Sequence, residues 1–313
     1  MVSYDVLVLG EVLVELSTSG PLRSGAELRL GFSGDALNVA AAAAAAGART
    51  GLLARMADDE LSDELCDRVA QLGVDTALLR RVSGEHGVYF VTADPDGSRE
   101  FVYVRRGSAG STLQPADLTG IDVAGAGAVV ASGITCAVSD SAWATVQAAA
   151  QQASRFIYDP NLRRRLTTVD EARAMLGELA PFAALVTPAA PGETRLLLGT
   201  DDPGVAAAAC RQLGAAAAMV TCGSDGVVLD SGAAPRRVPA VPPERLVDQT
   251  GAGDNFVGTV AARLVAGDPL ELAAALGCAA ASLSLSGQGG TGRVPTLAQT
   301  RAKLAATDPD AQA

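Results

Sequence analysis

The chain contains a single histidine, His86, and a single lysine, Lys303, among its 313 residues. One histidine excludes metal sites built from several imidazoles, and it leaves a Ser-His-Asp triad only if His86 belongs to it. Glycines at 84 and 87 flank His86, so we expect an ordinary surface or turn residue there. One lysine close to the C-terminus excludes a Walker A lysine, a Schiff-base lysine and the strand lysine of protein kinases. Any phosphate must therefore be held by backbone amides and arginines.

Paired cysteines, excess positive charge and long hydrophobic runs are also missing. The five cysteines lie far apart without a C-x-x-C pair, which excludes a disulfide framework or zinc site and fits a reducing cytoplasm. A net charge of −11 argues against nucleic acid or anionic membrane as partners. The longest uncharged stretch, 123–139, is short for a membrane span and is broken by glycines. The N-terminus carries no signal-peptide pattern. We therefore predict a cytoplasmic protein.

Strand-like apolar runs alternate with helical patterns along most of the chain. This alternation predicts a single α/β domain over 1–313, with a doubly wound, mostly parallel sheet flanked by helices. The expected strands are 6–10, 51–55, 128–133, 155–160, 184–188, 218–223 and 226–230. The expected helices are 35–47, 60–72, 140–153, 168–179, 203–213, 253–266, 269–285 and 296–305.

Two segments, 12–31 and 87–104, do not follow the alternation. The second contains two strand-like runs around Asp94-Pro-Asp-Gly97, which is typical of a hairpin. We expect both segments to form a small β-sheet lid over the carboxyl ends of the main strands. Ligands bind at that edge of doubly wound sheets, and a cover excludes water from the reaction.

The run Asp-Gln-Thr-Gly-Ala-Gly-Asp-Asn-Phe at 248–256 is the most informative part of the sequence. Gly251-Ala252-Gly253 lies in a turn that opens a helical pattern, where free amides and the helix dipole can bind an anion. Asp254 stands within that anion site and could accept a proton from a hydroxyl that attacks a phosphoryl group. Taken alone, the motif is more typical of an ordinary helix N-terminus with a capping Asp.

Together with Phe32-Ser-Gly34-Asp35-Ala-Leu-Asn38, this run resembles the two signatures of the ribokinase-like carbohydrate kinases, the PfkB family. The resemblance implies an ATP-dependent sugar kinase in which Asp254 is the base and the amides of Gly251, Ala252, Gly253 and Asp254 form the anion hole. By the same resemblance, ATP would lie over Thr221, Gly223 and Gly226 and near Cys278. Asp248 and Thr250 would adjoin a monovalent-cation loop, with K⁺ as its candidate ion, and Mg²⁺ would accompany ATP.

Three stretches, 87–90, 103–109 and 159–166, are most similar to 2-keto-3-deoxygluconate kinases within that family. A keto-acid sugar carries a carboxylate, and planar guanidinium groups pair carboxylates with two parallel hydrogen bonds. The resemblance assigns Arg105 and Arg163 to the substrate carboxylate or the phosphoryl oxygens. It assigns Tyr89 and Tyr103 to sugar hydroxyls, with Gly34, Asp35 and Asn38 at the base of the sugar. Packing on a hairpin explains the tyrosines equally well, and a helix N-cap explains Asp35 equally well.

Three positions depart from the family pattern. Glu193 matches the glutamate of an Asn-x-x-Glu motif that organises magnesium water, but Ala190 replaces its asparagine. Cys278 stands where asparagine is frequent, and Ser33 replaces the first glycine of the usual Gly-Gly. A ribokinase, fructokinase or nucleoside kinase, or a non-catalytic sugar-binding relative, therefore remains an alternative. An exposed lid sheet also allows a homodimer.

Overall fold

The computed structural model describes residues 3–18, 20–92 and 101–307. Its main sheet has nine strands, in an order that places early and late strands side by side. Across the sheet these are β13 (Arg236–Val238), β12 (Val227–Asp230), β11 (Ala218–Thr221), β10 (Ala183–Val186), β9 (Phe156–Asp159), β8 (Ala128–Ser132), β1 (Val6–Leu9), β4 (Thr50–Met56) and β5 (Leu79–Arg81). Strands β11 to β5 are parallel, and β12 and β13 add an antiparallel edge.

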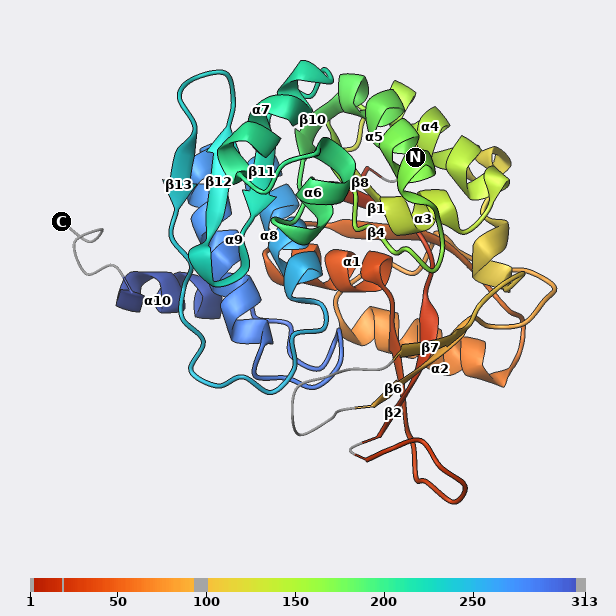
Figure 1. Cartoon of the computed structure of the whole chain (residues 1–313). Coiled ribbons are helices and arrows are strands. Elements are labelled where there is room, and N and C mark those ends of the chain that lie inside the picture. Colours follow the sequence, from red (N-terminus) through yellow and green to blue (C-terminus); the bar gives the residue numbers. More distant parts are fainter. Residues whose placement is uncertain (1–2, 19, 93–100, 308–313) are drawn as a thin grey trace.

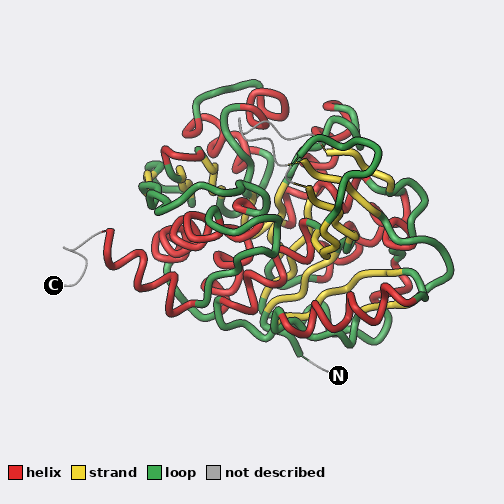
Figure 2. Tube along the Cα trace, turned by 90° about the horizontal axis from the view of Figure 1, so that it is seen from below, coloured by secondary structure: helices red, strands yellow, loops and turns green. Residues whose placement is uncertain are grey.

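Helices cover both faces of this sheet (Figures 1 and 2). The face that buries Val6, Val8 and Leu37 packs against α1 (Asp35–Ala45), α2 (Glu60–Gln71), α8 (Ala252–Val265) and α9 (Leu270–Ser284). The opposite face packs against α3 (Gly133–Ala137), α4 (Asp140–Gln152), α5 (Val169–Leu179), α6 (Gly192–Leu198) and α7 (Pro203–Gln212). Helix α10 (Leu297–Thr307) follows near the C-terminus. Strands buried on both faces explain why the sequence shows continuous apolar runs there.

The predicted lid forms a separate four-stranded sheet in the order β3 (Arg29–Ser33), β2 (Leu13–Thr18), β6 (Val88–Thr92), β7 (Phe101–Val104). Figure 1 shows β2, β6 and β7 extending from the body below α1. Strands β6 and β7 pair antiparallel, with Tyr89 opposite Tyr103. The predicted turn at 94–97 lies outside the described residues.

The expected helices and strands are confirmed within a few residues at each end, and the predicted fold class is confirmed. The sequence interpretation missed α3, α6, β5 and β13. Strands β5 and β13 are three residues long, too short for a period to show, and α6 begins directly after the proline-bracketed segment 188–191. In the part of the chain that the structure describes, no helix combines the length and apolarity needed to cross a bilayer.

Candidate active site

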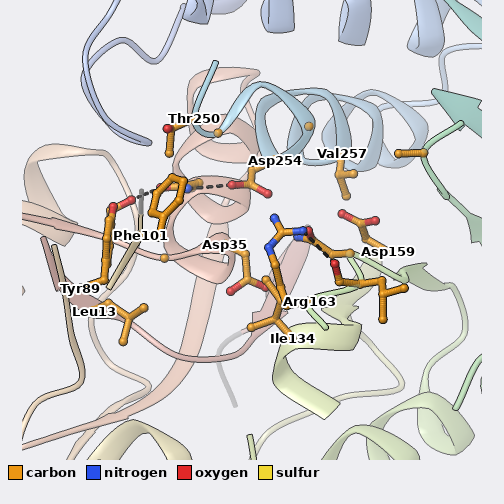
Figure 3. Close-up of a pocket in the computed structure, with 18 of the residues that line it drawn as sticks. Leu13, Asp35, Tyr89, Phe101, Ile134, Asp159, Arg163, Thr250, Asp254 and Val257 are labelled. Carbon is orange, nitrogen blue, oxygen red and sulfur yellow. Dashed lines mark hydrogen bonds between the residues drawn. The ribbon is translucent and has the colours of Figure 1, made fainter. Parts of the chain in front are cut away.

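A cavity of about 870 Å³ opens between the carboxyl ends of the parallel strands and the lid. Strand ends contribute Asp159 and Thr221, the lid contributes Tyr89 and Tyr103, and helix α8 contributes Asp254. Figure 3 shows Asp254, Asp35, Arg163 and Asp159 around the same space. The structure therefore brings together residues from both signatures and from the lid. This cavity lies at the carboxyl ends of the strands, where ligands bind in doubly wound sheets.

The glycine elbow is formed by Gly251, which caps α8 in a left-handed conformation with φ of 79°. A Cβ atom at 251 would lie 2.8 Å from the carbonyl oxygen of Gly290, so the close approach of these two loops requires glycine. Asp248 joins the same loops, because its carboxylate accepts the N–H of Thr250 at 2.7 Å and of Gly289 at 2.8 Å. No side chain caps this helix end.

The expected anion hole needs one correction. The N–H of Ala252 already donates to the carbonyl of Gln249 at 3.2 Å. This bond closes a tight turn over residues 249–252, directly before the regular hydrogen bonds of α8 begin. Among the described residues, the amides of Gly253 and Asp254 have no acceptor. Gly253 is exposed, and a Cβ there would meet nothing within 4 Å. The N–H of Gly251 likewise has no acceptor in the described part of the chain, so three amides of the predicted four, at 251, 253 and 254, are available to an anion.

Asp254 lies in the first turn of α8 with its side chain directed into the cavity (Figure 3). Its Oδ2 accepts a 2.7 Å hydrogen bond from Nδ2 of Asn38. Burial and the neighbouring Asp35 raise the pKa of Asp254 to about 7, although Asn38 and Arg163 act in the opposite direction. A carboxyl group with a pKa near neutrality can exchange protons at physiological pH, which suits a general base.

The first signature forms the wall facing Asp254. Gly34 caps α1 with φ of 126°, and a Cβ there would lie 2.8 Å from the carbonyl oxygen of Glu11. Asp35 is the first residue of α1 and makes no capping bond, so the N-cap alternative is wrong. Its carboxylate instead accepts a hydrogen bond from Ser132 and lines the cavity. Asn38 lies one turn further along α1.

A group of carboxyl side chains lies opposite α8. Asp159, at the end of β9, has its pKa raised well above the usual value by burial, by Glu193 and by Asp254. Burial also raises the pKa of Glu193, although its two oxygens accept the N–H groups of Leu162 at 2.5 Å and Ala189 at 2.8 Å. Arg163 acts to lower the pKa of both groups, but burial outweighs it, so the site favours their protonated forms more than water does.

The two predicted arginines differ. Arg105 is buried and its Nη2 lies 2.5 Å from Oε2 of Glu11, a residue that the sequence interpretation did not consider. Its charge is therefore compensated inside the protein, so Arg105 does not need a substrate carboxylate as its partner. Arg163 is exposed and hydrogen-bonds to the neighbouring Leu162 carbonyl at 3.3 Å. Within the described ranges it has no acidic partner at ion-pair distance.

The lid wall of the cavity is aromatic. Tyr89 and Tyr103 face each other with ring centroids 5.8 Å apart, and Phe101 stacks on Tyr103 at 6.0 Å. The Tyr89 hydroxyl donates to buried Glu15, so Tyr89 presents its ring to the cavity. Arg165 ties the lid to the body by donating to the Phe101 carbonyl at 2.6 Å.

The predicted nucleotide residues are only partly brought to the cavity. Thr221, Gly251 and Gly253 line it, whereas Gly223, Gly226 and Cys278 do not. Gly226 has a packing reason for glycine, since a Cβ there would lie 2.1 Å from the Val238 carbonyl oxygen. Cys278 is buried in α9, and burial raises the pKa of its thiol to about 12.

Several residues of the site were not predicted. Asp159 and Thr187 line the cavity, and Glu11, Glu15, Ser33 and Ser132 hold its side chains in place. Asp159 could have been found, because a polar residue that ends an apolar strand before Pro160 lies at the ligand edge of a parallel sheet. The partners of Glu11 and Glu15 are far away in the sequence, so no local pattern reveals them.

Comparison with known proteins agrees with this geometry. A family model described as "pfkB family carbohydrate kinase" matches residues 4–297. A 2-dehydro-3-deoxygluconokinase of Thermoproteus tenax is 33% identical over 300 residues, covering 93% of this chain and 91% of the relative. A 2-dehydro-3-deoxygalactonokinase of Haloferax volcanii is 27% identical over 288 residues, covering 89% and 90%.

Among solved structures, an E. coli protein described as a ribokinase II, in complex with ATP and Mg²⁺, superposes with a TM-score of 0.87. It is 23% identical and covers 97% of this chain and 99% of its own, which bears on the fold alone. The family match and the 33% identical relative both span nearly the whole chain. The chain therefore belongs to the pfkB family of carbohydrate kinases, as its two signatures predict.

Proposed function

We propose that this kinase transfers the γ-phosphoryl group of ATP to a hydroxyl of a 2-keto-3-deoxy sugar acid. The substrate oxygen attacks phosphorus, the bond between phosphorus and the β,γ-bridging oxygen breaks, and ADP leaves. Asp254 takes the proton from the attacking hydroxyl. The observation that carries this proposal is the position of Asp254, with a pKa of about 7, beside the free amides of Gly253 and its own residue. Those amides can stabilise charge on the transferred group.

Carboxyl groups at the cavity could assist the metal that accompanies ATP. Burial raises the pKa values of Asp159, Glu193 and Asp254, and a nearby cation would favour their ionised forms. Mg²⁺ keeps several waters and binds through one or two carboxylates and the phosphates. Bound there, Mg²⁺ would neutralise phosphate charge, while Glu193 and Asp159 would orient its water.

Arg163 carries the preference for an acidic sugar. It is an exposed guanidinium at the cavity, and its field already acts on Asp254, Asp159 and Tyr103. A substrate carboxylate can pair with it in the bidentate manner that Arg favours. Arg105 would contribute less, because Glu11 holds it. The names of the two relatives, which act on 2-dehydro-3-deoxy sugar acids, support the same class.

Three further expectations remain part of the proposal. A monovalent cation, K⁺, would act near Asp248 and Thr250, and replacing KCl by NaCl in the assay tests this. A homodimer would form through the outer face of the lid, where Leu30, Val102 and Val104 are exposed, and sedimentation tests it. A reducing cytoplasm suits the five free cysteines.

A substrate screen tests the proposed class. ATP consumption should be measured with 2-keto-3-deoxygluconate, its galacto epimer, fructose, ribose and adenosine. We expect turnover with the two keto acids and little with the three neutral compounds. A preference for fructose, ribose or adenosine would contradict the assignment and favour the neutral-substrate alternatives, which the pairing of Arg105 with Glu11 leaves open. No ATP consumption with any substrate would favour a non-catalytic sugar-binding protein.

A further inference from the structure

A chain of buried polar side chains leads to Asp254 from the lid. The hydroxyl of Ser33, the last residue of β3, donates to Oδ1 of Asn38 at 3.1 Å. The amide Nδ2 of Asn38 then donates to Oδ2 of Asp254 at 2.7 Å. Ser33 and Asn38 are 2% and 3% exposed, and the hydrogen bond between them is buried. This protein has Ser33 where the family pattern has glycine, so Ser33 adds a hydroxyl group beside Asn38.

The chain continues into the lid on the other side of Ser33. The Ser33 hydroxyl also lies within hydrogen-bonding reach of the Tyr89 oxygen, on β6. Tyr89 donates to the carboxylate of Glu15, on β2, which also accepts the N–H of Gly290. Ser33, Tyr89 and Glu15 thus come from β3, β6 and β2, three of the four lid strands. Figure 3 shows Tyr89 and Asp254 at the two ends of the part that lines the cavity.

The orientation of the Asn38 side-chain amide decides whether a hydrogen-bond donor or an acceptor faces the carboxylate of Asp254. An amide has a donor end and an acceptor end of nearly the same shape, so neighbouring groups must select between them. The ionised carboxylate of Asp254 can only accept, so it takes Nδ2, and the Ser33 hydroxyl satisfies the Oδ1 that remains by donating to it. The opposite orientation would place two acceptors face to face. Space is tight as well, since a Cβ at Gly290 would lie 2.4 to 2.6 Å from atoms of Asn38 and Ser33.

We propose that Ser33 is a positioning residue, which fixes the Asn38 amide so that Asn38 holds the catalytic carboxylate of Asp254 in its ionised, productive orientation. Tyr89, whose own hydroxyl donates to Glu15, lies next to the Ser33 hydroxyl on the lid side. This inference rests on Asp254 being the base, as proposed above. The other charged groups that face Asp254 are Asp35 from α1, Asp159 from β9 and Arg163 from the turn after β9. None of them is bonded to Ser33.

The test compares Ser33→Ala with the wild type and with Ser282→Ala. Ser282 is a buried serine of α9 whose hydroxyl has no partner among the described residues, so its removal controls for loss of a buried hydroxyl. kcat/KM for the sugar should be measured from pH 5 to 9, with KM for ATP and Tm. Loss of the donor to a carboxylate raises its pKa. We expect the acid limb of Ser33→Ala to move up by about 0.5 to 1 pH unit, with the ATP KM unchanged.

Two further variants show how Ser33 acts. If it acts through Asn38, then adding Ser33→Ala to Asn38→Ala leaves the midpoint of the acid limb where Asn38→Ala alone puts it. Tyr89→Phe keeps the aromatic wall and should shift the midpoint in the same direction by less, and this variant decides the matter if Ser33→Ala does not fold. An unchanged midpoint in a folded Ser33→Ala variant, or full additivity in the double variant, overturns the proposal. If Ser33→Ala does not fold, an unchanged midpoint in Tyr89→Phe overturns it.

Asp254→Asn separates this inference from the proposed function. An inactive Asp254→Asn together with an unshifted Ser33→Ala overturns the role of Ser33 and leaves the base in place. An active Asp254→Asn overturns the base and, with it, the role of Ser33.

Discussion

The side-chain amide of Asn38 lies 2.7 Å from the carboxylate of Asp254, and this hydrogen bond joins the two signature segments across 216 residues of sequence. Helices α1 and α8 bring them together, since both pack on the same face of the main sheet. The bond stabilises the ionised carboxylate, while burial and Asp35 favour the protonated one. The balance between them sets the pH range in which the protein can act as a kinase.

The kinase activity should therefore decrease as the pH falls below about 7. A general base works in its ionised form, and the pKa of Asp254 in the free protein is raised to about 7. We expect kcat/KM to decline tenfold per pH unit well below that value and to reach a plateau above it. A pH profile with saturating ATP measures this. A flat profile down to pH 5 would contradict the assigned environment of Asp254.

Asp254→Asn should raise thermal stability at high pH. In the unfolded chain an aspartate loses its proton near pH 4, whereas in the folded protein Asp254 loses it near pH 7. The folded state therefore loses relative stability as pH rises from about 4 to 7, and the loss is complete above 7. The neutral amide escapes this cost. Tm of the variant should exceed that of the wild type at pH 8, with the difference shrinking toward pH 4; a constant difference would argue against a raised pKa.

Substitution of Arg163 should affect substrate binding, whereas substitution of Arg105 should affect the stability of the fold. Arg163 is exposed and has no acidic partner in the described structure, so Arg163→Gln should leave Tm unchanged and raise KM for a keto-acid sugar about 10- to 100-fold, the worth of one charge-assisted pair. Arg105→Gln strands the buried Glu11 and should cost about 3 to 5 kcal/mol of folding free energy. Denaturant titration and steady-state kinetics measure the two effects. Equal loss of stability in both variants would contradict this division.

The two glycines of the elbow should also differ. Ala at 253 meets nothing within 4 Å, so Gly253→Ala should stabilise the first turn of α8 by up to about 1 kcal/mol. It should nevertheless lower kcat, because the methyl group stands beside the free amides where the phosphoryl group must approach. Gly251→Ala should destabilise, since φ is 79° and the Gly290 carbonyl blocks the new atom. Full activity in Gly253→Ala would show that no ligand approaches there.

Much of this site follows from the sequence because its main elements are local. The Gly251 turn, Asp254 and the strand–helix alternation are short-range patterns whose physical requirements appear within a few residues. Asp35 was open between a cap and a ligand contact, since one residue at a helix start fits both; the structure excludes the cap, because Gly34 is the N-cap. Arg105 lines the cavity, but its pairing with Glu11 could not be predicted, because Glu11 lies across the fold. Long-range pairing of charges is what the sequence does not display.

The cavity assignments of Gly226 and Cys278 illustrate the same limit. A glycine in a turn after a strand can serve a ligand or a packing contact, and at 226 the contact is with the backbone of 238–240. The free thiols of Cys222 and Cys278 interact with each other electrostatically beneath the loops, away from the residues lining the main cavity. Only the packed structure distinguishes these cases.

The most direct test of the account is the turnover of Asp254→Asn with ATP binding measured in parallel. Calorimetry should give an ATP affinity within a few-fold of the wild type, because the amides of residues 253 and 254 remain. Turnover with the preferred sugar should fall by about 10² to 10⁴, the worth of a general base. Turnover close to the wild type, in a variant that binds ATP normally, would contradict the central role of this carboxylate.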